Sequence, residues 1–318
     1  MNLIQANVSL REYSSFKIGG DAKYFLQVSS KEELVEGLKE WKNLSSKFDE
    51  QGKRIFVLGG GTNLLISDSG FPGLVIHVNI KAIEAVGTTI KIGAGNLIAD
   101  LLNVCVENSL SGLEWAGGLP GSVGGAVRGN AGAFGGETKD NVLEVESLDI
   151  NTLETRVRKN AECRFAYRDS IFKSGEGKDE VIISASFELK SGDKDDIEKG
   201  IEEKINYRQT KHPLESPNAG SIFKNVDIKN VPSMVLAEFE NHIKQDPFPV
   251  IPSAKLLIRA DLKGKRLGGA QVSEQHPNFI VNVGNARSSD VKDLIELEKE
   301  AVKQRLGIDL EVEVMFVE

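Results

Sequence analysis

The chain has 318 residues, more than one domain usually holds, so we expect two or three domains that share a site. Its formal charge of −8, from 39 basic and 47 acidic side chains, argues against a broad nucleic-acid-binding surface. Two cysteines without a CxxC pair and four histidines without metal-ligand spacing indicate neither a disulfide framework nor a metal site. We expect no metal, and Cys105 and Cys163 should be buried apolar side chains.

The first residues lack a charged start followed by an apolar core, and no stretch reaches the roughly 18 apolar residues that span a bilayer. We therefore expect a cytoplasmic protein without membrane insertion, and we expect it to act as a monomer.

The chain begins with an α/β pattern. A strand is predicted at residues 24–28, and Ser30 followed by Glu33 is a capping-box pattern that opens a helix. Residues 54–58 form a short buried strand that ends in the glycine turn 59–63. The apolar stripe of the helix consists of Leu34, Val35, Leu38, Trp41, Leu44 and Phe48.

Short strands continue the pattern from residue 73 to residue 95, and strands follow at 142–150 and 180–189. The charged stretch 191–196 is typical of a solvated helix start, and we place a domain boundary near residue 195. A helix between these strands is predicted to bury Leu97, Leu101, Val104 and Cys105.

The last third combines a strand at 278–282 with a long amphipathic helix at 289–306, which Gly307 ends. The chain closes in a strand whose alternation sends one set of side chains to each face. One face carries Leu310, Val312, Val314 and Phe316, and the other carries Glu311, Glu313 and Met315.

Two glycine-rich segments, 59–63 and 116–133, indicate backbone that approaches a ligand closely. The second carries apolar residues such as Leu119 and Val123, unlike a flexible polar linker. The first follows a strand, where successive N–H groups can bind a pyrophosphate. Neither a GxxxxGK[ST] loop nor a GxGxxG fingerprint in the right context occurs, so a less common dinucleotide fold is favoured.

A series of motifs over almost the whole chain resembles, in order and spacing, the UDP-N-acetylenolpyruvoylglucosamine reductase (MurB) family. The length suggests the shorter, type II-like branch of that family. The motifs lie at residues 15–20, 57–65, 120–127, 167–173, 219–225, 268–273 and 310–314.

The resemblance implies an α+β fold, in which a two-subdomain FAD-binding module of the vanillyl-alcohol-oxidase (PCMH) type precedes a smaller α+β substrate-binding domain. The expected boundaries are 1–80 and 81–195 for the two FAD subdomains and 196–307 for the substrate domain. Residues 308–318 would form a strand that returns to the FAD module.

The resemblance also implies an NADP-dependent flavoprotein oxidoreductase of peptidoglycan precursor synthesis, and hence of cell-wall biogenesis, cell shape and division. NADPH would reduce a noncovalent FAD, which would then reduce the enolpyruvyl ether of the UDP-sugar substrate to UDP-N-acetylmuramate. Hydride delivery leaves negative charge beside the substrate carboxylate, and a fixed cation must stabilise it. Arg168 fits because guanidinium stays protonated and binds carboxylates with two hydrogen bonds.

By resemblance, Ser221 is the proton donor and Glu313 the assisting carboxylate. Considered alone, each catalytic assignment has an ordinary alternative: Arg168 could pair with Asp169, Ser221 could cap a turn and Glu313 could face solvent.

The remaining site residues also come from the resemblance. The UDP-sugar would contact Tyr167, Lys211, Asn225 and His276. FAD would contact Lys17, Gly19, Gly59, Gly60, Gly61, Thr62, Asn63, Leu64, Pro120, Gly121, Ser122, Gly124, Gly125 and Ala126.

Three positions depart from the family pattern without removing a catalytic group. Gly129 stands where methionine is usual, Met315 where a basic residue is common, and Asp261 where glycine is typical. An alternative function is an FAD-dependent sugar or alcohol oxidase of the same superfamily. Such enzymes often attach flavin to a histidine or cysteine near the glycine loops, and none occurs between Gly59 and Gly70. A non-catalytic nucleotide-binding protein is a further alternative, which the three catalytic candidates disfavour.

Overall fold

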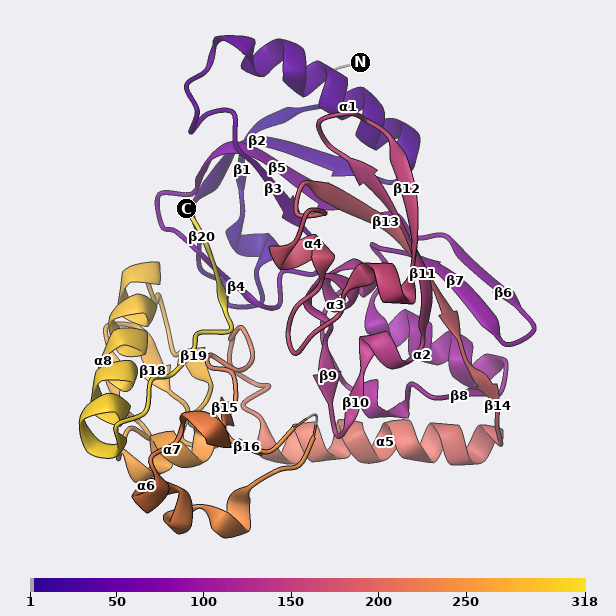
Figure 1. Cartoon of the computed structure of the whole chain (residues 1–318). Coiled ribbons are helices and arrows are strands. Elements are labelled where there is room, and N and C mark those ends of the chain that lie inside the picture. The colour runs from indigo at the N-terminus through magenta and orange to yellow at the C-terminus, as the bar shows by residue number, and fades with distance from the viewer. Residues whose placement is uncertain (1–2, 247) are drawn as a thin grey trace. The chain divides into compact units, whose positions relative to one another are not determined.

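The computed structural model describes residues 3–246 and 248–318. Contacts within the chain divide it into two compact units, each assembled from separate segments. Unit 1 contains the residues up to Val8 together with Ala22–Gly60 and Pro72–Tyr207, and unit 2 contains Ser9–Asp21, Gly61–Phe71 and Arg208–Glu318. Figure 1 shows the elements of both units.

The first sheet of unit 1 is covered by α1 (Lys31–Leu44). The helix begins as predicted, because the Ser30 hydroxyl accepts the N–H of Glu33 at 3.1 Å. It packs so closely that a Cβ on Gly37 would lie 2.3 Å from a methyl carbon of Leu26. The sheet has the order β1-β2-β5-β3, with β1 (Gln5–Ser9), β2 (Asp21–Val28), β5 (Phe71–Val78) and β3 (Ile55–Leu58).

The predicted apolar stripes extend too far in two helices. Leu44 is the last residue of α1 and is 41% exposed, because the chain leaves the helix in a 3-10 turn at Ser45–Lys47. Phe48 therefore lies beyond the helix and stacks on Tyr24 with ring centroids 5.3 Å apart. Leu97 precedes α2 (Ile98–Glu107) at its N-cap position and is 46% exposed.

The second sheet of unit 1 is antiparallel, and α2 and α3 (Val123–Gly129) share its apolar core. Cys105 and Cys163 are buried in that core, as predicted, and burial raises the pKa of the Cys105 thiol to about 12. The strand order is β12-β11-β13-β7-β6, with β12 (Thr155–Lys159), β11 (Val142–Asp149), β13 (Glu180–Glu188), β7 (Thr89–Gly93) and β6 (Ile83–Val86).

Smaller elements complete unit 1. The charged stretch after residue 190 leads into α5 (Lys194–Lys211), as predicted, and the chain passes to unit 2 within this helix. The others are α4 (Ile171–Ser174), the hairpin β9 (Gly132–Ala133) with β10 (Gly136–Glu137), and the pair β8 (Leu110–Ser111) with β14 (Lys190–Ser191).

Unit 2 has its own apolar core, to which the long helix α8 (Ser288–Leu306) contributes Val291, Leu294 and Ile295. Gly307 ends α8 at φ 69°, as predicted. The antiparallel sheet is β17 (Arg266–Leu267), β18 (Ala270–Val272) and β19 (Ile280–Asn282). The remaining elements are β15 (Val226–Asp227), β16 (Val250–Ile251), α6 (Ser233–Glu238) and α7 (Ser253–Arg259). In the described part of the chain, no helix is long and apolar enough to cross a membrane.

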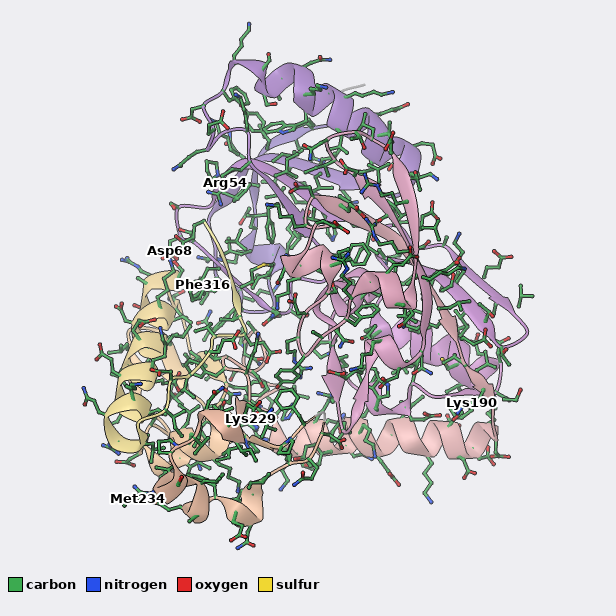
Figure 2. All side chains as sticks on the ribbon, viewed as in Figure 1. Arg54, Asp68, Lys190, Lys229, Met234 and Phe316 are labelled. Carbon is green, nitrogen blue, oxygen red and sulfur yellow. The ribbon has the colours of Figure 1, made fainter. Side chains whose placement is uncertain are left out.

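The C-terminal strand is shorter than predicted. Only β20 (Met315–Val317) is regular, and it pairs in parallel with β4 (Leu64–Ile66). A bend at Val314 interrupts the alternation, so Val317 is buried while Phe316 is 41% exposed. The prediction that Phe316 lies on one strand face with Leu310, Val312 and Val314 is therefore wrong. The Lys292 ammonium group lies 5.6 Å from the centroid of the Phe316 ring. Figure 2 labels Phe316.

Candidate active site

The two glycine-rich segments of unit 1 meet backbone against backbone. A Cβ on Gly60 would lie 2.8 Å from the Cα of Gly121 and 2.9 Å from the N of Ser122. The Ser122 hydroxyl accepts the N–H of Gly60 at 3.2 Å and that of Gly125 at 3.3 Å. Part of the glycine content is thus required by packing of one loop on the other.

These loops fit a nucleotide cofactor. Gly60 and Gly125 are exposed and carry no Cβ, so a ligand can approach the main chain closely here, while their own N–H groups donate to Ser122. A Cβ on Gly59 would lie 2.5 Å from the Ser122 hydroxyl and would disrupt the bridge between the loops. FAD would be held here by the loop residues 59–60 and 120–126.

The rest of the first loop lies in unit 2 and rests on the motif at residues 15–20. Gly61 has φ 65°, and a Cβ there would lie 1.8 Å from the carbonyl oxygen of Tyr13. Its carbonyl accepts the N–H of Ser15 at 3.0 Å, while the Ser15 hydroxyl donates to the carbonyl of Asn218 at 2.6 Å. Ser15 therefore joins the flavin-loop segment to the turn before Ser221.

The predicted cofactor contacts Lys17 and Gly19 have structural partners in the same unit. The Lys17 ammonium group lies 3.4 Å from a carboxylate oxygen of Glu12. A Cβ on Gly19 would lie 2.8 Å from that of Ile66, which explains why glycine is needed there. Their contact with FAD stays a prediction.

Ser221 and Glu313 lie on neighbouring segments of unit 2. Phe223 forms a β-bridge with Val312, and the N–H of Glu313 donates to the Ile222 carbonyl at 2.7 Å. On the other side, the Asn63 side chain donates to the Glu313 carbonyl at 3.1 Å. The structure thus pairs the main chain of the Ser221 segment with that of the Glu313 segment, which also contacts the predicted cofactor-loop residue Asn63.

A turn shaped by Asn218 presents Ser221. The Asn218 side-chain oxygen accepts the N–H of Gly220 at 2.9 Å, and its amide donates to the carbonyl of Ser216 at 2.8 Å. Gly220 has φ 77°, a left-handed conformation that glycine adopts without strain. Among the described residues the Ser221 hydroxyl has no hydrogen-bond partner, so it does not cap this turn.

Arg168 lies in unit 1, at a tight turn between Ala166 and Asp169. Its φ is 56°, a conformation that costs a non-glycine residue roughly 1–2 kcal/mol. Its guanidinium donates to the Gly132 carbonyl at 2.9 Å and lies 5.1 Å from the Tyr167 ring centroid. The Lys173 ammonium group donates to the Arg168 carbonyl at 2.6 Å and holds the turn.

The substrate candidates of unit 2 differ in their surroundings. Lys211 is exposed at the end of α5, and the side-chain oxygen of Asn225 accepts the N–H of Ser253 at 3.3 Å. His276 packs edge-on against His212 and Phe279, with ring centroids 5.3 and 4.9 Å away. Burial lowers the pKa of both histidines. The pKa of His212 falls to about 4, and the charges of His276 and Arg208 contribute less to this shift than burial does.

Asn278 was missed by the sequence analysis, which treated it as the first residue of a strand. The strand β19 begins at Ile280, and the buried side chain of Asn278 hydrogen-bonds Phe223 instead. An asparagine directly before an apolar strand is the signal that could have indicated such a role. In the described ranges, no group of three or more His, Cys, Asp and Glu side chains could hold a metal ion.

Two family models match the chain. Residues 23–153 match the FAD binding domain, and residues 212–317 match the C-terminal domain of UDP-N-acetylenolpyruvoylglucosamine reductase. The UDP-N-acetylenolpyruvoylglucosamine reductase of Caldanaerobacter subterraneus subsp. tengcongensis is 36% identical over 98% of this chain and 92% of its own length. The chain belongs to the UDP-N-acetylenolpyruvoylglucosamine reductase family.

Further comparisons agree with this family. The reductase of Lactobacillus delbrueckii subsp. bulgaricus is 38% identical over 99% of this chain and 95% of its own length. A crystal structure of the reductase from Thermus caldophilus matches with a TM-score of 0.76 and 29% identity, covering 99% of each chain. The predicted fold class, flavoprotein oxidoreductase class and FAD cofactor are confirmed.

Proposed function

We propose that this enzyme reduces UDP-N-acetylenolpyruvoylglucosamine to UDP-N-acetylmuramate, with NADPH as the reductant. The single observation that best supports this reaction is the pairing of the Ser221 segment with the Glu313 segment, next to Asn63 of the cofactor loop. A hydroxyl without a partner among the described residues, on a segment paired with the one that carries a carboxylate, suits a reaction that ends in proton transfer to carbon. An oxidase does not need that proton donor.

Each catalytic side chain has a distinct task in this proposal. Bound FAD supplies the hydride to the terminal carbon of the enolpyruvyl group. Arg168 stabilises the negative charge that develops on the neighbouring carbon and its carboxylate. Ser221 gives its proton to that carbon, which completes the saturated ether, and Glu313 assists the charge or the proton movement. Tyr167, Lys211, Asn225 and His276 contact the UDP-sugar.

The domain assignment is part of the same proposal. Residues 1–80 and 81–195 hold FAD, residues 196–307 bind the UDP-sugar as the substrate domain, and residues 308–318 carry Glu313 back toward the cofactor loop. The parallel pairing of β20 with β4 supports that return. The enzyme acts as a monomer in the cytoplasm.

An anaerobic stopped-flow experiment tests the reaction. The FAD-loaded protein is reduced with NADPH and then mixed with UDP-N-acetylenolpyruvoylglucosamine, and flavin absorbance is followed. We expect rapid reoxidation by this substrate. Reduction by NADPH without reoxidation by the substrate, together with fast reoxidation by oxygen, would favour an oxidase and overturn the proposal.

Ser221→Ala separates the two half-reactions. The variant keeps flavin reduction by NADPH almost intact, because no proton donor is needed there. Reoxidation by the enolpyruvyl substrate slows by about 10²–10⁴-fold, the usual contribution of a positioned acid. Equal losses in both half-reactions would contradict the proton-donor role.

Arg168→Lys tests the need for the guanidinium group. An ammonium group keeps the charge but cannot bind a carboxylate with two parallel hydrogen bonds. We expect kcat/KM for the UDP-sugar to fall by about 10²-fold or more, within the range seen when one charge-stabilising donor is removed. Near-normal turnover would contradict the assignment.

A further inference from the structure

Asn278 hydrogen-bonds the main chain of the residues that follow Ser221. Its side-chain oxygen accepts the N–H of Phe223 at 3.0 Å, and its side-chain amide donates to the Phe223 carbonyl at 2.9 Å. Its own carbonyl accepts the N–H of Ile222 at 2.8 Å. Asn278 is 4% exposed, and Phe223 is 1% exposed. One side chain therefore satisfies both main-chain groups of a buried residue, as a neighbouring strand would.

The Ser221 segment is fixed along both of its edges. One edge pairs with the C-terminal segment. The main-chain N–H of Glu313 donates to the Ile222 carbonyl at 2.7 Å, and that of Lys224 donates to the Glu311 carbonyl at 2.9 Å. Within the described residues, no regular strand pairs with the other edge, where Asn278 supplies the hydrogen bonds. Gly220, directly before Ser221, has a left-handed conformation. The hydrogen bonds between Asn278 and Phe223, after Ser221, are therefore needed to limit rotation of this segment.

We infer that Asn278 is a positioning residue for the Ser221 hydroxyl. The inference deepens the proposed function and rests on it, because it concerns the proton that Ser221 donates. Asn278 acts through the Ile222–Phe223 main chain and not through contact with the substrate. A serine is a weak acid, so its transfer rate depends strongly on its position, and a displacement of about 1 Å can cost about 10²-fold in rate.

The experiment follows the two half-reactions in FAD-loaded Asn278→Ala and Asn278→Asp. We expect Asn278→Ala to slow flavin reoxidation by UDP-N-acetylenolpyruvoylglucosamine by about 10–100-fold and to change reduction by NADPH by less than about 2-fold. In the Ser221→Ala background, the same change should add little further loss, because the proton donor that it positions is already absent.

Asn278→Asp adds a pH profile that a merely structural role would not produce. A protonated aspartic acid has nearly the shape of asparagine and can donate to the Phe223 carbonyl, whereas the carboxylate repels it. The reoxidation rate of this variant should therefore rise toward the unmodified rate as the pH falls. The ionisable groups on the surrounding segments include Lys224, Glu311, Glu313, Glu274, His276 and His212. Their own titration is measured in Asn278→Ala over the same pH range.

Val302→Ala is the matched control, because Val302 is fully buried in the unit 2 core on α8 and has no hydrogen-bonding side chain that could hold the Ser221 segment. If Val302→Ala, at equal loss of stability in urea, slows reoxidation as much as Asn278→Ala, the inference is overturned. Full additivity with Ser221→Ala, or an Asn278→Asp profile parallel to that of Asn278→Ala, also overturns it. Unchanged reoxidation in Ser221→Ala alone instead overturns the proposed function, and this inference with it.

Discussion

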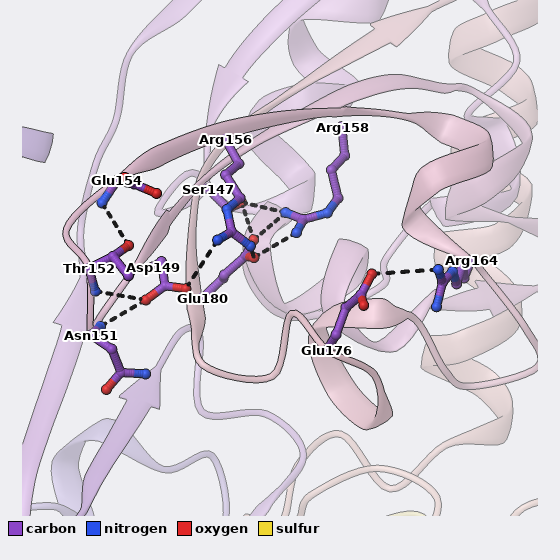
Figure 3. A network of polar contacts seen from close by, with 10 residues as sticks. All are labelled: Ser147, Asp149, Asn151, Thr152, Glu154, Arg156, Arg158, Arg164, Glu176 and Glu180. Carbon is purple, nitrogen blue, oxygen red and sulfur yellow. Dashed lines mark hydrogen bonds and ion pairs between the residues drawn. The ribbon is translucent and has the colours of Figure 1, made fainter.

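Glu180 of unit 1 and Glu298 of unit 2 are both buried, and they differ in their hydrogen-bond partners. In unit 1, Glu180 on β13 accepts hydrogen bonds from Ser147 at 2.6 Å, from Arg156 at 3.1 Å and from both terminal nitrogens of Arg158 (Figure 3). In unit 2, Glu298 on α8 is 0% exposed, and neither carboxyl oxygen has a partner among the described residues. Burial therefore raises the pKa of Glu298 well above its usual range.

The difference has consequences for stability. Removing a buried carboxylate that has two guanidinium partners leaves those charges unpaired. Burial of a carboxyl group without partners favours its neutral form, which still leaves its polar atoms unsatisfied. We therefore expect loss of Glu180 to destabilise unit 1, and loss of Glu298 to stabilise unit 2.

Glu180→Gln should have the largest effect on folding. The change keeps the shape but leaves the Arg158 guanidinium, 11% exposed, without its carboxylate. We expect the free energy of unfolding of unit 1 to fall by about 3 kcal/mol, the low end for breaking a buried pair, because Arg156 is 41% exposed. The only tryptophans, Trp41 and Trp115, lie in unit 1, so their fluorescence in urea follows this unit.

Glu144→Gln is the matched control on β11. Glu144 pairs with Lys159 at 2.6 Å, but the lysine side chain is 67% exposed. A surface pair contributes at most about 0.5–1 kcal/mol, so this variant should unfold almost as the unmodified protein does. Similar losses in both variants would show that burial of Glu180 adds nothing.

The sequence predicted most elements because their signals are local. The Ser30 cap, the glycine stop of α8 and the buried strands all depend on residues next to one another in the chain. The errors arose where regular geometry ends. The exposure of Phe316 depends on a bend at Val314, and that of Leu44 on a 3-10 turn, and neither has a clear local signal.

The family resemblance gave Ser221 and Glu313, and their catalytic roles stay predictions. The residues that hold their segments were not predictable, because the segments pair across a long separation, 87 residues between Lys224 and Glu311. The partners of Asn278 and of Ser15 likewise lie far away in the sequence. Asp261, by contrast, has a local explanation. Its φ of 57° explains why glycine is typical at this position.

Glu298→Leu should have the next largest effect, of opposite sign. It removes unsatisfied polar atoms from the core and should raise the stability of unit 2 by about 2 kcal/mol at pH 7. At acid pH the carboxyl is protonated in both states. Above its ordinary pKa of 4.5 the unfolded chain loses the proton first, so the stability of unit 2 falls as the pH rises toward the raised pKa.

Glu298→Gln separates the effect of unsatisfied polar atoms from the effect of titration, because glutamine keeps such atoms but does not titrate. The variant should lose the pH slope without the full gain of Glu298→Leu. Hydrogen exchange of α8 peptides, followed by mass spectrometry, measures unit 2 separately from the tryptophan signal. A fall in stability for Glu298→Leu would indicate that the carboxyl group has a compensating partner after all.

His212→Gln should have the smallest effect, which is on the stability of unit 2 at acid pH. The pKa of His212 is lowered from 6.5 to about 4, so the unfolded chain binds a proton that the folded unit excludes between these values. The stability of unit 2 should therefore fall as the pH drops from 6.5 toward 4, and His212→Gln should recover about 1 kcal/mol at pH 5, allowing for solvent screening. Hydrogen exchange of α8 at pH 5 and pH 7 measures this difference, and the tryptophan signal of unit 1 should not change. If His212→Gln leaves the slope intact, the slope comes from another group of unit 2, such as His276, whose pKa burial also lowers.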